Sequence, residues 1–113
     1  MRRGEVWVAN LNPTRGQEIG KIRPVVIMQA NELLDAGMPM VVVLPLTARL
    51  FAGTNRWRVT VPPRDRLLRD SQVIVDQPRT LDRTRLGDGP LTQLKDDEMA
   101  AVEEGLKVIL GFL

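Results

Sequence analysis

The stretch MVVVLPL, residues 40–46, is the longest apolar run in this 113-residue chain and the feature that decides the fold class. Its three consecutive valines are β-branched, and a short apolar run of this kind is typical of a buried strand. The run contains a proline and is far shorter than the ~20 apolar residues that a helix needs to span a bilayer. The sequence therefore predicts a buried strand in a soluble protein, which we expect to be cytoplasmic.

Further strands are predicted on both sides of this run, where β-branched and aromatic residues alternate with glycine- and proline-containing turns. The expected strands are residues 5–10, 25–29, 40–46, 57–61 and 72–76, with a short one at 79–81. Residues 30–36 are expected to form a helical turn. A polar loop at residues 15–21 carries two glycines, which permit unusual backbone dihedral angles.

The C-terminal segment has a different period, because its apolar residues recur at intervals of three and four. These residues are Met99, Val102, Leu106, Ile109 and Leu113. Three acidic residues at 96–98 would occupy the first turn of the predicted helix and complement its dipole. We therefore expect a mainly β fold, a small barrel-like sheet covered by one C-terminal helix. Residues 1–113 are expected to form a single domain, as the chain length also suggests.

The composition excludes several kinds of chemistry, because the chain contains no histidine, cysteine or tyrosine. Without cysteine there is no disulfide, zinc–thiolate site or thiol nucleophile. Without histidine there is no imidazole base, Ser-His-Asp triad or histidine metal ligand. An enzyme with this sequence must use arginine, lysine, carboxylates, hydroxyls and the backbone.

Positive charge is concentrated in the first three quarters of the chain. Residues 1–87 hold 14 basic and eight acidic residues, a net charge of +6, whereas residues 88–113 hold two basic and six acidic ones. Thirteen of the 16 basic residues are arginine, whose planar fork matches a phosphate group. The pattern indicates a polyanionic partner such as nucleic acid. The alternative is that the arginines pair with neighbouring aspartates on the surface.

Four collinear motifs carry a resemblance to a known family. They are RGEVW at 3–7 with NPTRGQE at 12–18, KIRPVVI at 21–27, VLPLT at 43–47, and DQPRTLD at 76–82 followed by RL at 85–86. In this order they resemble the MazF/PemK toxin endoribonucleases of type II toxin–antitoxin systems, and the similarity covers essentially the whole chain.

The resemblance implies an SH3-like barrel of the plasmid-maintenance-toxin (CcdB-like) type that forms a homodimer. It implies a metal-independent endoribonuclease, without a cofactor, that cuts single-stranded mRNA at a short sequence. The expected products are a 2′,3′-cyclic phosphate and a 5′-hydroxyl. The implied partner is a MazE-like antitoxin, whose extended acidic C-terminal segment covers the RNA site, and no membrane is involved.

Two residues match the catalytic positions of this family, Arg23 and Thr47. RNA supplies its own nucleophile, so the protein must align the reacting atoms and stabilise the extra negative charge. Arginine is ordinarily protonated, and removing its proton at pH 7 costs about 7.5 kcal/mol, which favours charge stabilisation by Arg23 over base catalysis. The structural alternatives are an Arg23–Glu18 ion pair and a strand-end Thr47 that bonds the backbone.

Asp76 matches an aspartate proposed as general base in one branch of the family. That role needs burial to raise its pKa, and the sequence equally allows Asp76 to position RNA or to hold Arg79. This chain lacks the other groups of that branch, because Ile74 replaces an arginine and Gln17 replaces a histidine. Ala48 also stands where the family often has serine, which removes a second hydroxyl.

Amide and charged side chains in the motifs are candidates for substrate contact, because such groups can read base edges in unstacked RNA. They are Gln17, Glu18, Lys21, Gln77 and Arg79. Phe51 or Trp57 could stack on a base, although Trp57 is expected to belong to the core. Aspartates recur at intervals of five or six residues from Asp65 to Asp88, but the interleaved arginines disfavour a magnesium site.

Two other functions remain open from sequence alone. A toxin of the same fold could block a protein target, as the gyrase-poisoning relatives do, or the domain could hold RNA without cleaving it. The matches at Arg23 and Thr47 favour the ribonuclease.

Overall fold

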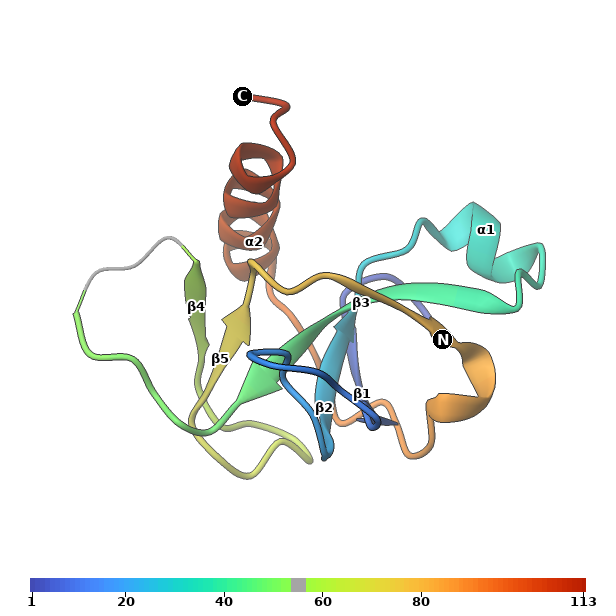
Figure 1. Ribbon diagram of the computed structural model, residues 1–113, viewed down its shortest axis with the longest axis horizontal. Helices are drawn as coiled ribbons and strands as arrows, with labels where there is room; N and C mark the ends of the chain where they lie inside the picture. Colours follow the sequence, from blue (N-terminus) through green and yellow to red (C-terminus); the bar gives the residue numbers. More distant parts are fainter. Residues whose placement is uncertain (54–56) are drawn as a thin grey trace.

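The computed structural model describes residues 1–53 and 57–113, and this part of the chain forms a curled sheet with the long C-terminal helix on one side and a short helix on the other (Figure 1). The strands are β1 (Glu5–Asn10), β2 (Ile22–Ile27), β3 (Met40–Thr47), β4 (Arg58–Val61), β5 (Ser71–Ile74), β6 (Arg79–Asp82) and β7 (Thr92–Gln93). The helices are α1 (Asn31–Asp35), α2 (Asp96–Ile109) and a 3₁₀ turn, η1 (Arg83–Arg85).

Strand β3 organises the sheet, as the apolar run at residues 40–46 predicts. The strand order is β4-β5-β3-β2-β1-β7, and β6 pairs with the beginning of β3. Every pairing is antiparallel. The first half of β3 pairs with β6 and its last two residues pair with β5, so this strand passes from one half of the curled sheet to the other. Such a strand is a common way of turning a corner in a closed or half-closed sheet.

The core consists of two apolar clusters, and β3 contributes to both of them. Val41 and Val43 belong to the cluster shared with β1, β2 and β6. Leu44 and Leu46 belong to the cluster on which α2 packs. All four side chains are fully buried, and burying such a side chain stabilises the fold by about 1.5–3 kcal/mol. The prediction of a buried strand is confirmed.

The fold class is confirmed, but several element boundaries differ from the prediction. Strand β1 has the predicted ends. Strand β2 spans residues 22–27 where a strand at 25–29 was expected, so it both begins and ends earlier in the chain, by three and two residues. The reason is pairing, because Ile22, Arg23 and Pro24 lie opposite β1. Trp57 lies outside β4 and is half-buried. The two-residue strand β7 was not predicted, since its sequence has no strand pattern.

Helix α2 is confirmed, with one correction at its end. Met99, Val102, Leu106 and Ile109 pack on the apolar core as predicted, but Leu113 is 69% exposed and lies beyond the helix. The helix ends because Gly111 adopts a positive φ of 81°. The amides of Gly111 and Phe112 then donate to the carbonyls of Val108 and Lys107, which is a Schellman motif. In the described ranges no helix has the length and apolar character required to cross a membrane.

Candidate active site

A cleft of about 700 Å³ opens beside the beginning of β2 and the end of β3, next to the β1–β2 loop (residues 11–21) and the segment that links β4 to β5. Five basic residues line it, and none of its described lining residues is acidic. The basic residues are Lys21, Arg23, Arg49, Arg66 and Arg69. Only Arg66 pairs with a described carboxylate, that of Asp88. The cleft is therefore electropositive and suited to an anionic ligand.

Arg23 projects into this cleft from β2, and backbone carbonyls hold its guanidinium. Nε donates to the Gly20 carbonyl at 2.7 Å, and Nη1 donates to the Leu46 carbonyl at 3.4 Å. Burial lowers the pKa of Arg23 from its ordinary value, because a partly desolvated site disfavours the charged form. A guanidinium has five N–H donors, so three remain available to an anionic ligand after these two contacts.

The structure does not contain the ion pair between Arg23 and Glu18 that the sequence left open. Glu18 Oε1 accepts a hydrogen bond from the Arg15 amide at 2.6 Å, which closes a turn in the β1–β2 loop. No described carboxylate forms an ion pair with Arg23. The positive charge in the cleft is therefore not neutralised by these neighbours.

Thr47 is the last residue of β3 and lies in the same cleft. Its neighbour Leu46 provides the carbonyl that accepts from Arg23, so the backbone brings Arg23 and Thr47 together. Thr47 Oγ1 accepts a hydrogen bond from the Arg49 amide at 3.0 Å. This is the strand-end bond expected of a structural threonine, yet the hydroxyl proton remains available to donate to a ligand.

Asp76 is not among the residues that line the cleft. It follows β5, and its carboxylate forms an ion pair with Arg58 at 3.3 Å. Its side chain is 47% exposed, so the burial that a general base would need is absent. The alternative contact with Arg79 is not formed either, because Arg79 bonds backbone carbonyls instead.

The positions at which this chain departs from the family pattern have clear places in the structure. Ile74 is fully buried in the core, whereas Gln17 is exposed in the β1–β2 loop. Ala48 lines the cleft next to Thr47 and adds no hydroxyl there. The second hydroxyl expected after Thr47 is thus replaced by a methyl group.

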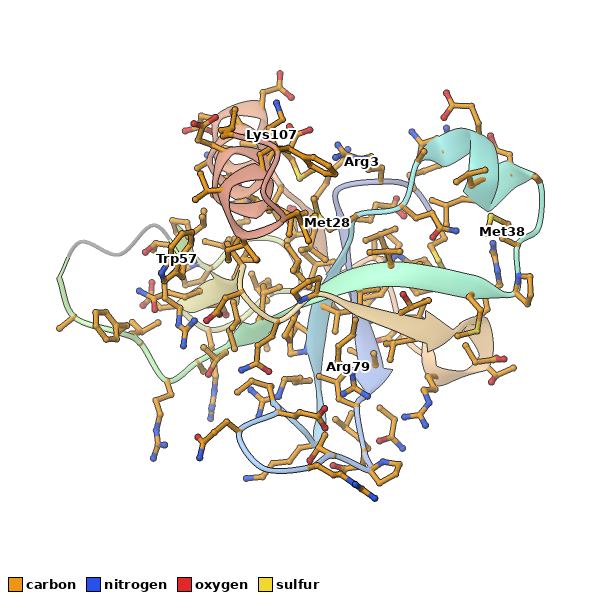
Figure 2. All side chains as sticks on the ribbon, turned by 45° about the horizontal axis from the view of Figure 1, so that its top comes forward. Arg3, Met28, Met38, Trp57, Arg79 and Lys107 are labelled. Atoms are coloured by element: carbon orange, nitrogen blue, oxygen red, sulfur yellow. The ribbon has the colours of Figure 1, made fainter. Side chains whose placement is uncertain are left out.

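Among the five candidates for substrate contact, only Lys21 lines the cleft. Gln77 and Arg79 instead bond the backbone of the β1–β2 loop, and Figure 2 shows the Arg79 side chain beside that loop. Gln17 and Glu18 lie in the loop itself and are exposed.

Three cleft arginines were not singled out from the sequence: Arg49, Arg66 and Arg69. The only signal for them is the excess of arginine in residues 1–87, which does not distinguish one arginine from another. Arg49 follows β3 by two residues, whereas Arg66 and Arg69 belong to the β4–β5 link and reach the cleft only through the fold.

The two aromatic candidates for base stacking lie outside the cleft lining. Phe51 is 51% exposed, and both of its backbone polar groups bond the side-chain amide of Gln72. Trp57 is half-buried, which agrees with the expectation of a core residue only in part. Between them the loop contains residues 54–56, which lie outside the described residues.

The regularly spaced aspartates do not gather around one point. Asp65 accepts from Thr92, Asp82 from Thr84, and Asp76 and Asp88 pair with arginines. In residues 1–53 and 57–113 no group of three carboxylates is arranged to hold a metal ion.

Comparisons with known proteins agree with the fold. A family model of the PemK-like, MazF-like toxins of type II toxin–antitoxin systems matches residues 2–110. A curated relative, Endoribonuclease MazF of Staphylococcus saprophyticus, is 38% identical over 112 residues, which cover 98% of this chain and 92% of the relative. The chain therefore belongs to the PemK-like, MazF-like toxin family.

Solved structures support the same conclusion. MazF from Deinococcus radiodurans superposes with a TM-score of 0.80 at 26% identity, covering 98% of this chain and 96% of that one. An endoribonuclease in complex with its cognate antitoxin, from a mycobacterial species, superposes with a TM-score of 0.76 at 25% identity, covering 100% of this chain and 97% of the other. The family of toxins and the fold are thus established together.

Proposed function

We propose that this endoribonuclease toxin cleaves single-stranded mRNA without a metal ion, using the 2′-hydroxyl of the substrate as nucleophile. The 2′-oxygen attacks the adjacent phosphorus and the bond from phosphorus to the 5′-oxygen breaks. The products are a 2′,3′-cyclic phosphate and a 5′-hydroxyl. The reaction moves a proton from the 2′-hydroxyl to the leaving oxygen, so no external proton is consumed.

The observation that carries this proposal is the meeting of Arg23 and Thr47 in a cleft with five basic residues and no described acidic lining residue. As the phosphorus becomes five-coordinate, negative charge accumulates on its non-bridging oxygens. A guanidinium already fixed by two carbonyls can contact these oxygens without reorganising, which is the main source of stabilisation in such sites.

Arg23 and Thr47 have different parts in this mechanism. The free N–H groups of Arg23 bind the phosphate and stabilise its charge. Because burial lowers the pKa of Arg23, proton donation toward the leaving oxygen costs less than it would from an exposed arginine. The Thr47 hydroxyl donates to a phosphate oxygen, while its oxygen accepts from the Arg49 amide and so fixes the hydroxyl group.

The remaining cleft cations hold the RNA strand, as we infer from their position. Lys21, Arg49 and Arg69 form no ion pair with a described carboxylate, so each can bind a phosphate of the substrate. The exposed side chains of Gln17 and Glu18, in the adjoining loop, are proposed to contact bases.

The proposed protein partner is a MazE-like antitoxin, and the active toxin is proposed to be a homodimer. An extended acidic segment is complementary to the electropositive cleft. A relative of the same fold has been solved in complex with its cognate antitoxin. Size-exclusion chromatography with light scattering tests the dimer, and competition between antitoxin peptide and RNA tests the shared site.

The decisive experiment maps the ends of long synthetic RNAs after incubation with the purified toxin in EDTA. The expected result is cleavage at one short sequence, with cyclic phosphate and 5′-hydroxyl ends. Cleavage only after magnesium is added would contradict the metal-free mechanism. Retardation of intact RNA, or growth inhibition by a protein that leaves every transcript uncut, would instead indicate a binding module or a protein-directed toxin.

A further inference from the structure

The segment DQPRT, residues 76–80, contains two motif residues whose side chains turn away from the cleft and toward the β1–β2 loop. Gln77 and Arg79 do not line the cleft. Their polar groups meet the backbone of a loop that lies 58–68 residues earlier in the chain. These contacts connect the segment to the active site through the loop backbone.

Gln77 makes a two-point contact with the loop. Its Oε1 accepts a hydrogen bond from the Ile19 amide at 2.8 Å, and its Nε2 donates to the Gln17 carbonyl at 3.3 Å. A side-chain amide has the same donor and acceptor as a peptide group, so it can satisfy loop backbone groups that have no strand partner. One lone pair of Oε1 and one N–H of Nε2 are therefore engaged with the protein.

Arg79 joins the two limbs of the same loop. Its Nη1 donates to the Leu11 carbonyl at 2.7 Å and to the Ile19 carbonyl at 3.4 Å. Leu11 begins the loop and Ile19 lies on its return limb. Ile19 is consequently held at its amide by Gln77 and at its carbonyl by Arg79.

The residue after Ile19 is Gly20, whose carbonyl accepts from Arg23 Nε at 2.7 Å. Gly20 lies close to its neighbours, since a Cβ there would lie 2.8 Å from Oδ1 of Asn12. The same Oδ1 accepts from the Lys21 amide at 2.9 Å, and Lys21 has a positive φ of 70°. A continuous set of fixed backbone groups thus leads from Ile19 to the guanidinium of Arg23.

We propose that Gln77 and Arg79 are positioning residues for Arg23. By fixing Ile19 they place the Gly20 carbonyl, and this carbonyl sets the direction in which the guanidinium presents its free N–H groups. This inference rests on the proposed ribonuclease function and assigns the two residues a role other than substrate contact. A misplaced guanidinium loses charge stabilisation in the transition state, while RNA binding by the other cleft cations is retained.

The test compares Gln77→Ala with Gln93→Ala, a matched glutamine on β7 outside the cleft. Gln77→Ala is expected to lower kcat roughly 10- to 100-fold, since small misplacements of a reacting group have effects of this size. KM and the cleaved RNA sequence are expected to stay as in the wild type. Gln93→Ala should leave all three unchanged. A raised KM with unchanged kcat, or a relaxed cleavage sequence, would show that Gln77 contacts RNA and would overturn the proposal.

A second measurement does not depend on cleavage. In ¹⁵N NMR spectra of the full chain, Gln77→Ala should remove the exchange protection of the Ile19 amide and shift the Arg23 Nε–H signal. An Arg23 signal identical to that of the wild type would overturn the positioning role. If the wild-type protein fails to cleave RNA, the ribonuclease proposal fails, whereas this spectrum still decides whether Gln77 positions Arg23.

A milder variant is available if Gln77→Ala does not fold. Gln77→Glu keeps an oxygen acceptor for the Ile19 amide but cannot donate to the Gln17 carbonyl. An Arg23 Nε–H shift in the same direction, with an unchanged cleavage sequence, supports the proposal, and an unshifted signal contradicts it.

Discussion

The cleft and the region beside α2 each contain a partly buried arginine, Arg23 and Arg64, and the two regions shift the pKa of the guanidinium in opposite directions. Arg23 in the cleft donates to carbonyls, and burial lowers its pKa. Arg64 donates to both carboxylate oxygens of Glu98, at 2.5 and 3.0 Å, and this hydrogen bonding raises its pKa. Neutral carbonyls hold a guanidinium in place and leave its charge uncompensated. A carboxylate holds it in place and also neutralises its charge. The comparison teaches that the type of partner decides whether a partly buried guanidinium keeps an uncompensated positive charge.

The contacts between Arg64 and Glu98 also attach α2 to the rest of the fold. Glu98 lies in the first turn of α2 and accepts from the Lys95 amide at 2.8 Å as well as from Arg64. Arg64 Nη2 further donates to the Gln93 carbonyl at 2.9 Å. The link between β4 and β5 is thereby tied to the beginning of the helix. Further along α2, Arg3 pairs with Glu103.

The largest expected effect on cleavage comes from removing Arg23. Arg23→Ala should lower kcat about 10²- to 10³-fold, the usual cost of losing one donor that stabilises the transition state. Thr47→Ala should also abolish most cleavage, with little change in circular dichroism. Cleavage rates are measured by RNA end-mapping. Undiminished cleavage by Arg23→Ala would contradict the catalytic assignment and remove the distinction between the two regions.

The matched substitution at Arg64 should lower the stability of the fold and leave cleavage unchanged. Arg64→Ala leaves the nearly buried Glu98 carboxylate, 10% exposed, without its main partner. The free energy of unfolding is expected to fall by about 1–3 kcal/mol, as measured by urea denaturation. The kcat of the folded variant should equal that of the wild type, and a large loss of kcat would place Arg64 in the active site.

The Glu98 pair also predicts a pH dependence of stability. Burial tends to raise the pKa of Glu98, but the hydrogen bonds from Arg64 and the Lys95 amide, with the charges of both residues, lower it overall below its ordinary value of 4.5. A carboxylate with a depressed pKa stabilises the fold above pH 4.5, and this contribution is lost as the pH falls through the lower folded value. Glu98→Gln should therefore be less stable than the wild type at pH 7 and show a flatter decline below pH 4.5 in urea denaturation. An equal slope would contradict it.

A smaller effect is expected for the cations that bind substrate without reacting. RNA affinity should fall as salt rises, because each phosphate contact with single-stranded RNA contributes a log–log slope of about −0.7. Arg49→Ala should reduce the magnitude of the slope by about this amount. Arg2→Ala is the matched control, since Arg2 lies outside the cleft and pairs with Asp35. Fluorescence anisotropy with a labelled RNA measures both variants, and a flat salt response would contradict an electrostatic RNA site.

The smallest effect is expected at Asp76. Its exposed ion pair with Arg58 is worth about 0–1 kcal/mol, so Asp76→Asn should change kcat by no more than about fivefold. A loss comparable to that of Arg23→Ala would show that Asp76 acts as the general base after all. Cleavage assays over a range of pH distinguish the two outcomes.

The success and failure of the sequence predictions have physical causes that differ from region to region. Strand β1 was predicted well because a run rich in β-branched and aromatic residues ends at Asn12-Pro13. Helix α2 was predicted well because its apolar residues follow the helical period. Strand β2 was misplaced by three residues because its beginning is decided by pairing with β1, across Arg23 and Pro24. Leu113 continues the helical spacing, yet Gly111 ends the helix before it.

For the candidate active site, the sequence indicated Arg23 and Thr47 through the resemblance of their motifs to the toxin family, and it indicated an anionic ligand through the charge excess in residues 1–87. These conclusions depend on residue type and local spacing, which the chain carries without folding. Only the tertiary structure decided which partners the polar and charged side chains have. Gln77 bonds Ile19, which lies 58 positions away in the chain, and Arg64 bonds Glu98, which lies 34 positions away. Folding thus placed the Arg23 guanidinium beside neutral carbonyls and paired the Arg64 guanidinium with a carboxylate.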